Sequence, residues 1–584
     1  MDAGRRAWSS SSTGGFRLPP VLVPITWTAA GVAVLVTAWT PGNGLDPTDE
    51  ASYLQAVLAR GRGDAFNGFS GFYLRFLWQV AGWDIGVVRL LSLSILVALA
   101  TVVGWATARL LQVEAKVVVP MTIAASTSYY ATSWRTPSYN WLALLGASVA
   151  CVGLLRLLAD ASSAWGAVSG LGVAVSATGK LPTAALLAVV VALAESRRPR
   201  ALLWSAGALV AAVLVHLLAF SPALTLTVIR RSASMLAAVS PDSYTLPGAL
   251  LAALLGLGYG VVRGVLGGGV FGLLPLVLAA RRPPGSNRYT LVCRLAVLAS
   301  IVTALLTRTW SGGLSTLFVG AGLLPVLLAV AVALAVGRRL GLVAEAPGPH
   351  VVAAGVLIAA AAACVFGSAL QISWQLVTVS MVLGPAILFL CHGYLFPGRS
   401  LTVALVIAAI SIGSVIVAIE TREDPRRSAP WSRATVPVRL EGVTVRTDPH
   451  TARQLQTTTS AAVTAGWRAG TPLIDTTFTP AVPLALQARV PPVLLPAFPH
   501  YAAESVCVAV RGLGADWRSA WLIVRPDDSE GRKRQIASYL GRRYPDDYLT
   551  VAAFDGRRSY AVQLLRPRPT PIGAPAPAGS CLTP

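Results

Sequence analysis

Three carboxylates lie close together in the segment LDPTDEASYL, residues 45–54, which follows the first long apolar run of the chain: Asp46, Asp49 and Glu50. Charge is scarce in the apolar part of this chain, so a charged cluster beside it suggests a function. In a water-poor pocket, a carboxylate can act as a general base that takes a proton from an attacking hydroxyl group. The structural alternatives are a solvated acidic loop, or a helix N-cap by Asp49 with Glu50 in the first turn.

The sequence contains few patterns typical of metal sites or of reactive cysteines. The five histidines are scattered, and no CxxC or HExxH pattern occurs, so no metal site follows from spacing. Clustered carboxylates suit hard divalent cations, which leaves a cation beside the acidic segment as an open alternative. Cys507 and Cys581 can pair as a disulfide if the last part of the chain lies outside the cytoplasm.

The elements that must position the acidic segment are membrane spans. The chain has 584 residues, of which 54% are hydrophobic and 12% are charged, and apolar runs of about 17 to 25 residues can each cross a hydrocarbon core. Much of the net charge of +22 is arginine in short loops between these runs, which indicates the positive-inside rule rather than nucleic-acid binding. The chain is predicted to be a polytopic α-helical membrane protein with about 13 transmembrane helices, the first being a retained span rather than a cleaved signal: 21–40, 86–111, 117–131, 140–158, 164–178, 181–195, 201–220, one within 247–280, 291–307, 314–336, 350–369, 372–391 and 401–419.

The predicted topology places the acidic segment on the outer face. Residues 1–20 are polar and basic and are expected to be a disordered cytoplasmic lead, followed by the transmembrane domain, residues 21–420. An odd number of spans then places residues 421–584 outside the cytoplasm. The outer segment 41–83 is too polar to cross, and it predicts an amphipathic helix after Asp49 and then aromatic-rich interfacial helices.

Residues 421–584 have the composition of a soluble protein and predict a separate α/β domain. Short apolar runs at 472–476, 520–525, 548–554 and 560–566 alternate with helical patterns, including one around 532–544. The end of the chain is Pro-rich and is expected to be extended. No Walker A motif and no nucleophile elbow occur in the sequence.

An enzyme acting on sugars at the outer face has no nucleotide donor available, so a polyprenyl phosphate in the membrane would have to deliver the sugar. Three motifs are relevant here: TDEASY (48–53), WRTPSYNW (134–141) and GKLPTAALL (179–187). In this order, and with about 13 spans and an extracytoplasmic C-terminal domain, they resemble the GT-C superfamily of integral membrane glycosyltransferases. The resemblance covers about residues 1–420 and is strongest to the branch of lipid A aminoarabinose transferase and the protein O-mannosyltransferases. The chain has Ser138, Tyr139 and Asn140 where many relatives have an acidic residue.

This resemblance implies an inverting transfer of a hexose or pentose from a polyprenyl-phosphate donor to a glycan, lipid or protein acceptor of the cell envelope. The reaction would take place on the extracytoplasmic face of a bacterial plasma membrane. Asp49 is the expected general base. Glu50 would raise the basicity of Asp49 or orient the acceptor, and Asp46 is the reserve candidate for the base.

The lipid phosphate that leaves in such a reaction needs cations to stabilise its charge. A lysine between two apolar runs, such as Lys180, is costly unless it is paired, although it can also snorkel to an interface. The other candidates for phosphate binding are arginines of the second motif or of predicted outer loops: Arg135, Arg230, Arg231 and Arg308. Tyr53, Tyr139 and Asn140 are the candidate substrate-pocket residues, with structural packing as the alternative for the two tyrosines.

Two other function classes remain open from the sequence. A transporter or flippase often has inverted repeats and broken or charged helices near the bilayer midplane, whereas no repeat is visible here and the acidic cluster lies outside a span. A non-catalytic scaffold that binds cell-wall polymer would leave the acidic segment without a role.

Overall fold

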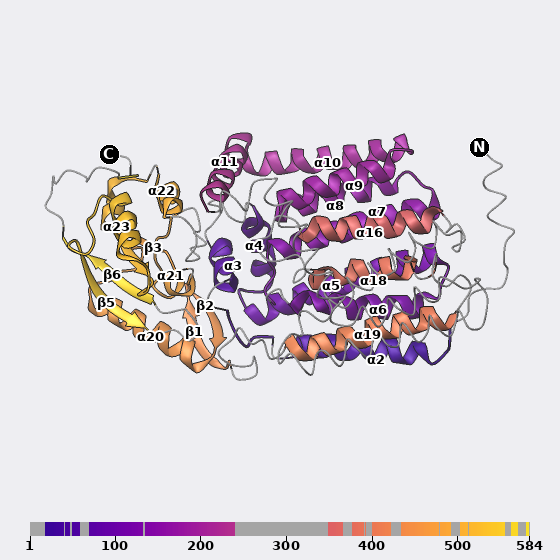
Figure 1. Cartoon of the computed structure of the whole chain (residues 1–584), viewed down its shortest axis with the longest axis horizontal. Helices are drawn as coiled ribbons and strands as arrows, with labels where there is room; N and C mark the ends of the chain where they lie inside the picture. The colour runs from indigo at the N-terminus through magenta and orange to yellow at the C-terminus, as the bar shows by residue number, and fades with distance from the viewer. Residues whose placement is uncertain are drawn as a thin grey trace, which may run out of the picture.

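The computed structural model of this protein describes residues 18–39, 41–46, 49–58, 69–131, 135–239, 348–365, 376–390, 392, 400–421, 434–477, 479–491, 503–511, 513–554, 562–569 and 580–582. These residues form two parts, a bundle of apolar helices and a smaller α/β part that contains the C-terminus (Figure 1). Helices α3 and α4 lie between the two parts.

The bundle consists of helices that run alongside one another (Figure 1): α2 (Leu22–Ala38), α5 (Ile85–Leu111), α6 (Ala115–Thr127), α7 (Tyr139–Asp160), α8 (Trp165–Gly179), α9 (Leu181–Glu195), α10 (Pro199–Phe220), α16 (Gly348–Val365), α18 (Ser380–Leu390) and α19 (Ser400–Thr421). Four of the described helices, α5, α7, α10 and α16, are long and apolar enough to cross a membrane. Each predicted span outside 240–347 overlaps one of the bundle helices. The three spans predicted between 247 and 336 lie outside the described residues.

Exposed and buried surfaces are both apolar in this bundle, as expected for helices that cross a bilayer. On α10, Leu203 is 72% exposed and Leu218 is 88% exposed, which suits contact with lipid rather than with water. The buried side of α7 instead packs closely on α8. A methyl group at Gly146 of α7 would clash with the backbone of Ser176, so a glycine is needed there for the two helices to approach.

Further helices, most of them short, lie at the end of the bundle that faces the C-terminal part (Figure 1). They are α3 (Asp49–Leu58), α4 (Ser70–Val80), the 3₁₀ helix η1 (Ser128–Ala131) and α11 (Pro222–Val239). Helix α3 coincides with the amphipathic helix predicted after Asp49, and α4 with the aromatic-rich interfacial segment. On α4, Trp78 is fully buried whereas Phe76 is 71% exposed, so its two faces meet different surroundings. Helix α11 lies between two predicted spans, in the segment that carries Arg230 and Arg231.

The C-terminal part is built on a mixed four-stranded sheet of order β3-β4-β6-β5. Strands β3 (Leu473–Asp475) and β4 (Trp521–Val524) are parallel, whereas β6 (Val562–Pro567) is antiparallel to both β4 and β5 (Tyr548–Phe554). These four strands coincide with the four apolar runs expected from the sequence, and α23 (Glu530–Tyr539) with the expected helical pattern. The C-terminal part also contains a hairpin of β1 (Val436–Leu440) and β2 (Val443–Thr447), followed by helix α20 (Pro449–Thr464), none of which was predicted from the sequence.

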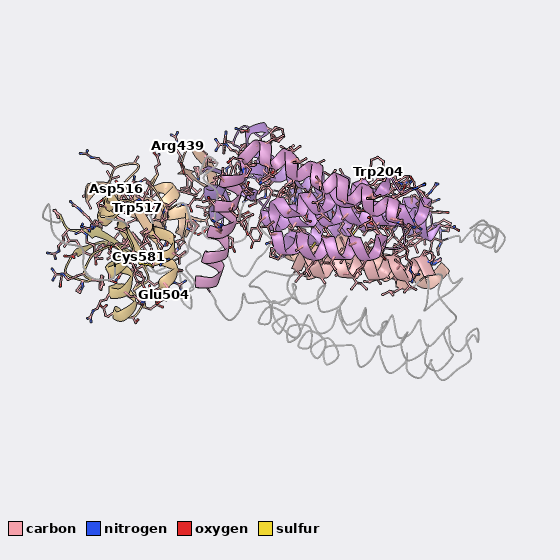
Figure 2. The ribbon with its side chains drawn as sticks, turned by 90° about the horizontal axis from the view of Figure 1, so that it is seen from above. Trp204, Arg439, Glu504, Asp516, Trp517 and Cys581 are labelled. Carbon is pink, nitrogen blue, oxygen red and sulfur yellow. A yellow bond between two sulfur atoms is a disulfide. The ribbon has the colours of Figure 1, made fainter. Side chains whose placement is uncertain are left out.

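A disulfide closes the C-terminal part. Cys507 lies on α22 (Glu504–Val510) and is bonded to Cys581 near the end of the chain, as the sequence allowed. Figure 2 shows Cys581 in the C-terminal part, well away from Trp204 of α10. The two parts touch where α21 (Ala481–Ala485) meets α3, where α22 meets α11 and where β2 meets α5. The C-terminal part therefore lies directly over the end of the bundle that carries the acidic segment.

Candidate active site at one end of the helix bundle

The acidic segment begins with a helix cap made by Asp46. The Asp46 carboxylate oxygen Oδ2 accepts a hydrogen bond from the backbone N–H of Asp49 at 2.6 Å, and the Asp46 N–H donates to Oε2 of Glu50 at 3.0 Å. The two hydrogen bonds run in opposite directions, so each of the two carboxylates satisfies a backbone N–H group near the start of α3. Asp49 is the first residue of α3, so the capping carboxylate is Asp46 and not Asp49.

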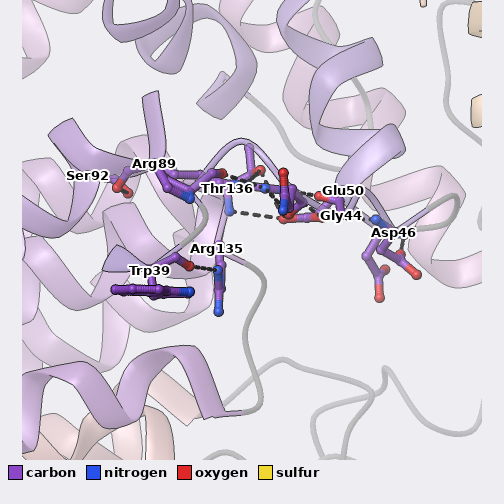
Figure 3. Close-up of polar contacts among 11 residues, drawn as sticks. Trp39, Gly44, Asp46, Glu50, Arg89, Ser92, Arg135 and Thr136 are labelled. Carbon is purple, nitrogen blue, oxygen red and sulfur yellow. Dashed lines mark hydrogen bonds and ion pairs between the residues drawn. The ribbon is translucent and has the colours of Figure 1, made fainter. Parts of the chain in front are cut away.

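Glu50 forms a buried ion pair with an arginine of the bundle. Its side chain is fully buried, and the Arg89 Nη2 lies 3.0 Å from each of its two carboxylate oxygens. Arg89 is 3% exposed and also donates to the backbone oxygens of Pro41 at 2.9 Å, Asn43 at 3.0 Å and Gly44 at 2.7 Å. The pair therefore ties α3 and the preceding loop to α5 (Figure 3).

The second motif joins the same network through Thr136. The Thr136 backbone N–H and hydroxyl donate to Oε1 of Glu50 at 3.1 and 3.0 Å, and its hydroxyl accepts from Nε of Arg89 at 3.2 Å. Next to it, Arg135 is 7% exposed and donates to the Trp39 carbonyl oxygen at 3.1 Å. Figure 3 shows the Glu50 and Arg135 contacts side by side, with Asp46 on the far side of Glu50. The first and second motifs are thus joined by direct hydrogen bonds.

Asp49 and the two motif tyrosines lie beside this network. Asp49 and Asn140 are partly exposed, and Tyr53 follows Asp49 by one helical turn on α3. The Tyr53 and Tyr139 rings meet edge to face with centroids 5.9 Å apart. Burial raises the pKa of the Tyr53 phenol, and Tyr139, Asp49 and Asp46 act in the same direction. The tyrosine hydroxyl therefore stays protonated and can act as a hydrogen-bond donor beside Asp49.

The third motif packs against the start of α7, next to the second motif. Lys180 lies between α8 and α9, is 6% exposed and donates from Nζ to the Cys364 carbonyl oxygen of α16 at 3.4 Å. The preceding Gly179 packs against the start of α7, where a methyl group would clash with the Tyr139 carbonyl oxygen. Tyr139 therefore contacts α3 with its ring and the third motif with its backbone, so all three motifs meet in one region.

The remaining predicted cations lie elsewhere or outside the described residues. Arg230 is exposed on α11, and Arg231 is the next residue of the same helix. Arg308 lies outside the described residues. In the part of the chain that the structure describes, no group of three or more His, Cys, Asp or Glu side chains could hold a metal ion.

Arg89 is the main site residue that the sequence analysis missed. It is an isolated charge near the start of the apolar run 85–111, and charge in such a run is rare and usually paired or functional. Its position near the outer end of a predicted span, with Glu50 in the preceding outer segment, was the available signal. Thr136 carried no comparable signal, because a loop threonine is common.

No protein-family model and no curated protein matches this chain. Among solved structures, the chain is similar to the crystal structure of ArnT from Cupriavidus metallidurans in the apo state. The sequence identity is 14% and the TM-score is 0.37, over 92% of this chain and 96% of that chain.

Proposed function

We propose that this protein is a GT-C-type membrane glycosyltransferase that uses a polyprenyl-phosphate sugar donor and a cell-envelope acceptor on the extracytoplasmic face. The observation that carries the proposal is the meeting of the three motifs at one end of an apolar helix bundle. Asp49 and Tyr53 of α3, Tyr139 of α7 and the Gly179–Lys180 segment come from distant parts of the sequence. Apolar helices beneath them suit a lipid-linked donor.

In the proposed reaction, a hydroxyl oxygen of the acceptor attacks the anomeric carbon of the donor sugar. A new C–O bond forms as the bond between that carbon and the phosphate oxygen breaks, and the electron pair leaves with the lipid phosphate. The attack occurs in one step on the face opposite the leaving phosphate, which inverts the configuration at the anomeric carbon. The Asp49 carboxylate takes the proton from the acceptor hydroxyl. Asp49 suits this role because it is partly exposed at the start of α3, next to a protonated tyrosine.

The roles of the neighbouring acidic residues follow from their contacts. Both Glu50 oxygens lie against Arg89, and Oε1 also accepts two hydrogen bonds from Thr136. We therefore assign Glu50 to positioning α3 rather than to the acceptor. Asp46 caps α3. Lys180 and Arg135, both buried near the motifs, are the first candidates for binding the phosphate, followed by Arg230, Arg231 and Arg308.

The disulfide supports the outer placement of the site. Disulfides persist in oxidising compartments and are rare in the cytoplasm, and the Cys507–Cys581 bond lies in the part of the protein that covers the acidic segment. That end of the molecule is therefore proposed to face outward.

The experiment that tests the function is a transfer assay with purified full-length protein in detergent. The protein is offered a panel of polyprenyl-phosphate pentoses and hexoses together with cell-envelope extract as a source of acceptor. We expect one donor to yield a sugar–acceptor product and a free polyprenyl phosphate in equal amounts. Lipid translocation in proteoliposomes without any transfer from the same donors would instead indicate a flippase.

A further inference from the structure

The loop before α3 is held from two sides. On the bundle side, the backbone oxygens of Asn43 and Gly44 accept hydrogen bonds from Arg89 at 3.0 and 2.7 Å. On the side of the C-terminal part, the Gly44 N–H donates to the Ala434 carbonyl oxygen at 3.3 Å, and Arg446 donates from Nη1 to Oδ1 of Asn43 at 3.4 Å. The same two loop residues therefore link the bundle to the β1–β2 hairpin.

The hairpin also reaches α3 itself through α21. The N–H of Glu441, in the hairpin turn, donates to the Leu484 carbonyl oxygen of α21 at 3.2 Å, and α21 contacts α3. Leu484 is 1% exposed and Ala434 is 4% exposed, so these contacts lie in packed surroundings. The hairpin and α21 thus touch both the loop and the helix that carry the acidic residues.

We propose that the C-terminal part positions the acidic segment for catalysis, with Arg446 as a positioning residue that acts through Asn43. This inference rests on the proposed function, because it assigns Arg446 to the placement of Asp49. The connection is short, since Asn43 lies three residues before Asp46, whose carboxylate caps the helix that starts at Asp49. A displacement of about 1 Å in a catalytic group can lower a rate by about 100-fold. The hydrogen bonds that hold this loop are therefore expected to affect kcat.

The first test compares two arginines of the same hairpin. Both arginines are exposed, but Arg446 of β2 contacts the loop through Asn43, whereas Arg439 lies on the neighbouring strand β1 (Figure 2). Arg439→Ala is therefore a matched control. We expect Arg446→Ala to lower kcat at least about tenfold with little change in the KM for the donor, because the binding groups remain. Arg439→Ala should keep the wild-type kcat, and Arg446→Lys should restore part of it.

A double-mutant cycle tests whether Arg446 acts through Asn43. Asn43→Ala should lower kcat about as much as Arg446→Ala, and the double variant should be no slower than either single variant. Multiplicative losses in the double variant would contradict a shared contact. A wild-type kcat in Arg446→Ala would overturn the inference.

A readout independent of sugar transfer separates this inference from the proposed function. Hydrogen–deuterium exchange of the backbone in residues 41–58 reports how firmly the loop and α3 are held. We expect faster exchange there in Arg446→Ala and wild-type exchange in Arg439→Ala. If no donor supports transfer by the wild type, the proposed function fails, and this exchange still decides whether Arg446 holds the loop. Unchanged exchange in Arg446→Ala would show that it does not.

Discussion

At the scale of single residues, the acidic cluster separates into three roles. Asp46 caps α3. Glu50 is paired with Arg89 and hydrogen-bonded to Thr136. Asp49 lies at the partly exposed start of the helix, beside Tyr53. A charge buried beside an apolar bundle must be compensated, which explains why Glu50 and Arg89 are found together. The residue proposed to move a proton is the one of the three that is neither fully buried nor the helix cap.

The exchange Asp49→Asn tests the proposed base. It should lower kcat by about 100-fold or more while the protein still folds, because the amide cannot accept the proton. The matched control is Asp46→Asn, since asparagine caps helices about as well as aspartate; it should stay within about tenfold of the wild-type rate. Rates are measured in the transfer assay and folding by thermal unfolding in detergent. Wild-type turnover in Asp49→Asn would exclude it as the base.

The Glu50–Arg89 pair is expected to dominate the local stability. Glu50→Gln leaves Arg89 buried without its counter-charge and should lower the free energy of unfolding by about 3–5 kcal/mol. The double variant Glu50→Gln/Arg89→Gln should lose less than the sum of the single variants, because no uncompensated charge remains. Thermal unfolding of the wild type, the two single variants and the double variant gives the coupling free energy between Glu50 and Arg89. Additive losses would show that the pair is not an energetic unit.

At the scale of elements, close helix packing brings the motifs together. Helix α7 starts at Tyr139 and packs along α8, which ends at Gly179. Because α8 ends against the start of α7, Lys180 emerges beside the second motif. The approach depends on residues without side chains at the crossing points, as is common between membrane helices.

The glycine at the end of α8 therefore has a testable role. A methyl group in Gly179→Ala would clash with the Tyr139 carbonyl oxygen, so we expect a displaced Lys180–Tyr139 region and at least about a tenfold loss of kcat. Gly207→Ala on α10 is the control, because nothing lies within 4 Å of the added methyl group. Alanine also favours the helix by about 0.8–1.0 kcal/mol over glycine, so the control should be at least as stable as the wild type. Equal activity of the two variants would contradict the packing argument.

At the scale of the whole molecule, the C-terminal part and the bundle meet at the candidate site. Helix α22 contacts α11, α21 contacts α3 and the hairpin touches the acidic loop. The disulfide fastens α22 to a residue 74 positions later in the chain. The C-terminal part is thus cross-linked by a disulfide and contacts the bundle through several elements.

Removing the disulfide should loosen the C-terminal part selectively. Cys507→Ser opens a long loop and should cost about 2–4 kcal/mol of stability in that part. Backbone exchange should rise in α22 and α23, while the buried helices α5 and α7 keep wild-type exchange. Cys151→Ser, at a buried free cysteine of the bundle, should leave α22 and α23 unchanged. Wild-type exchange in α22 of Cys507→Ser would show that the bond contributes little.

Several features were readable from local patterns. Apolar runs of sufficient length mark the bundle helices, an acidic cap followed by an amphipathic repeat marks α3, and short apolar runs mark the four strands of the mixed sheet. In the structure, Val436–Leu440 and Val443–Thr447 also alternate between buried and exposed residues, on either side of a turn at Glu441 and Gly442. Such patterns are local because helix and strand periods repeat within a few residues.

The sequence by itself determined that an acidic segment follows the first span, that aromatic and basic residues accompany it and that an α/β part follows the apolar part. Only the tertiary structure decided which carboxylate is buried. Asp49 and Glu50 are neighbours on a helix, so their side chains point about 100° apart, and the face that meets α5 is set by packing. That packing brought Glu50 to Arg89, 39 residues later, and Tyr53 to Tyr139, contacts that no local period encodes.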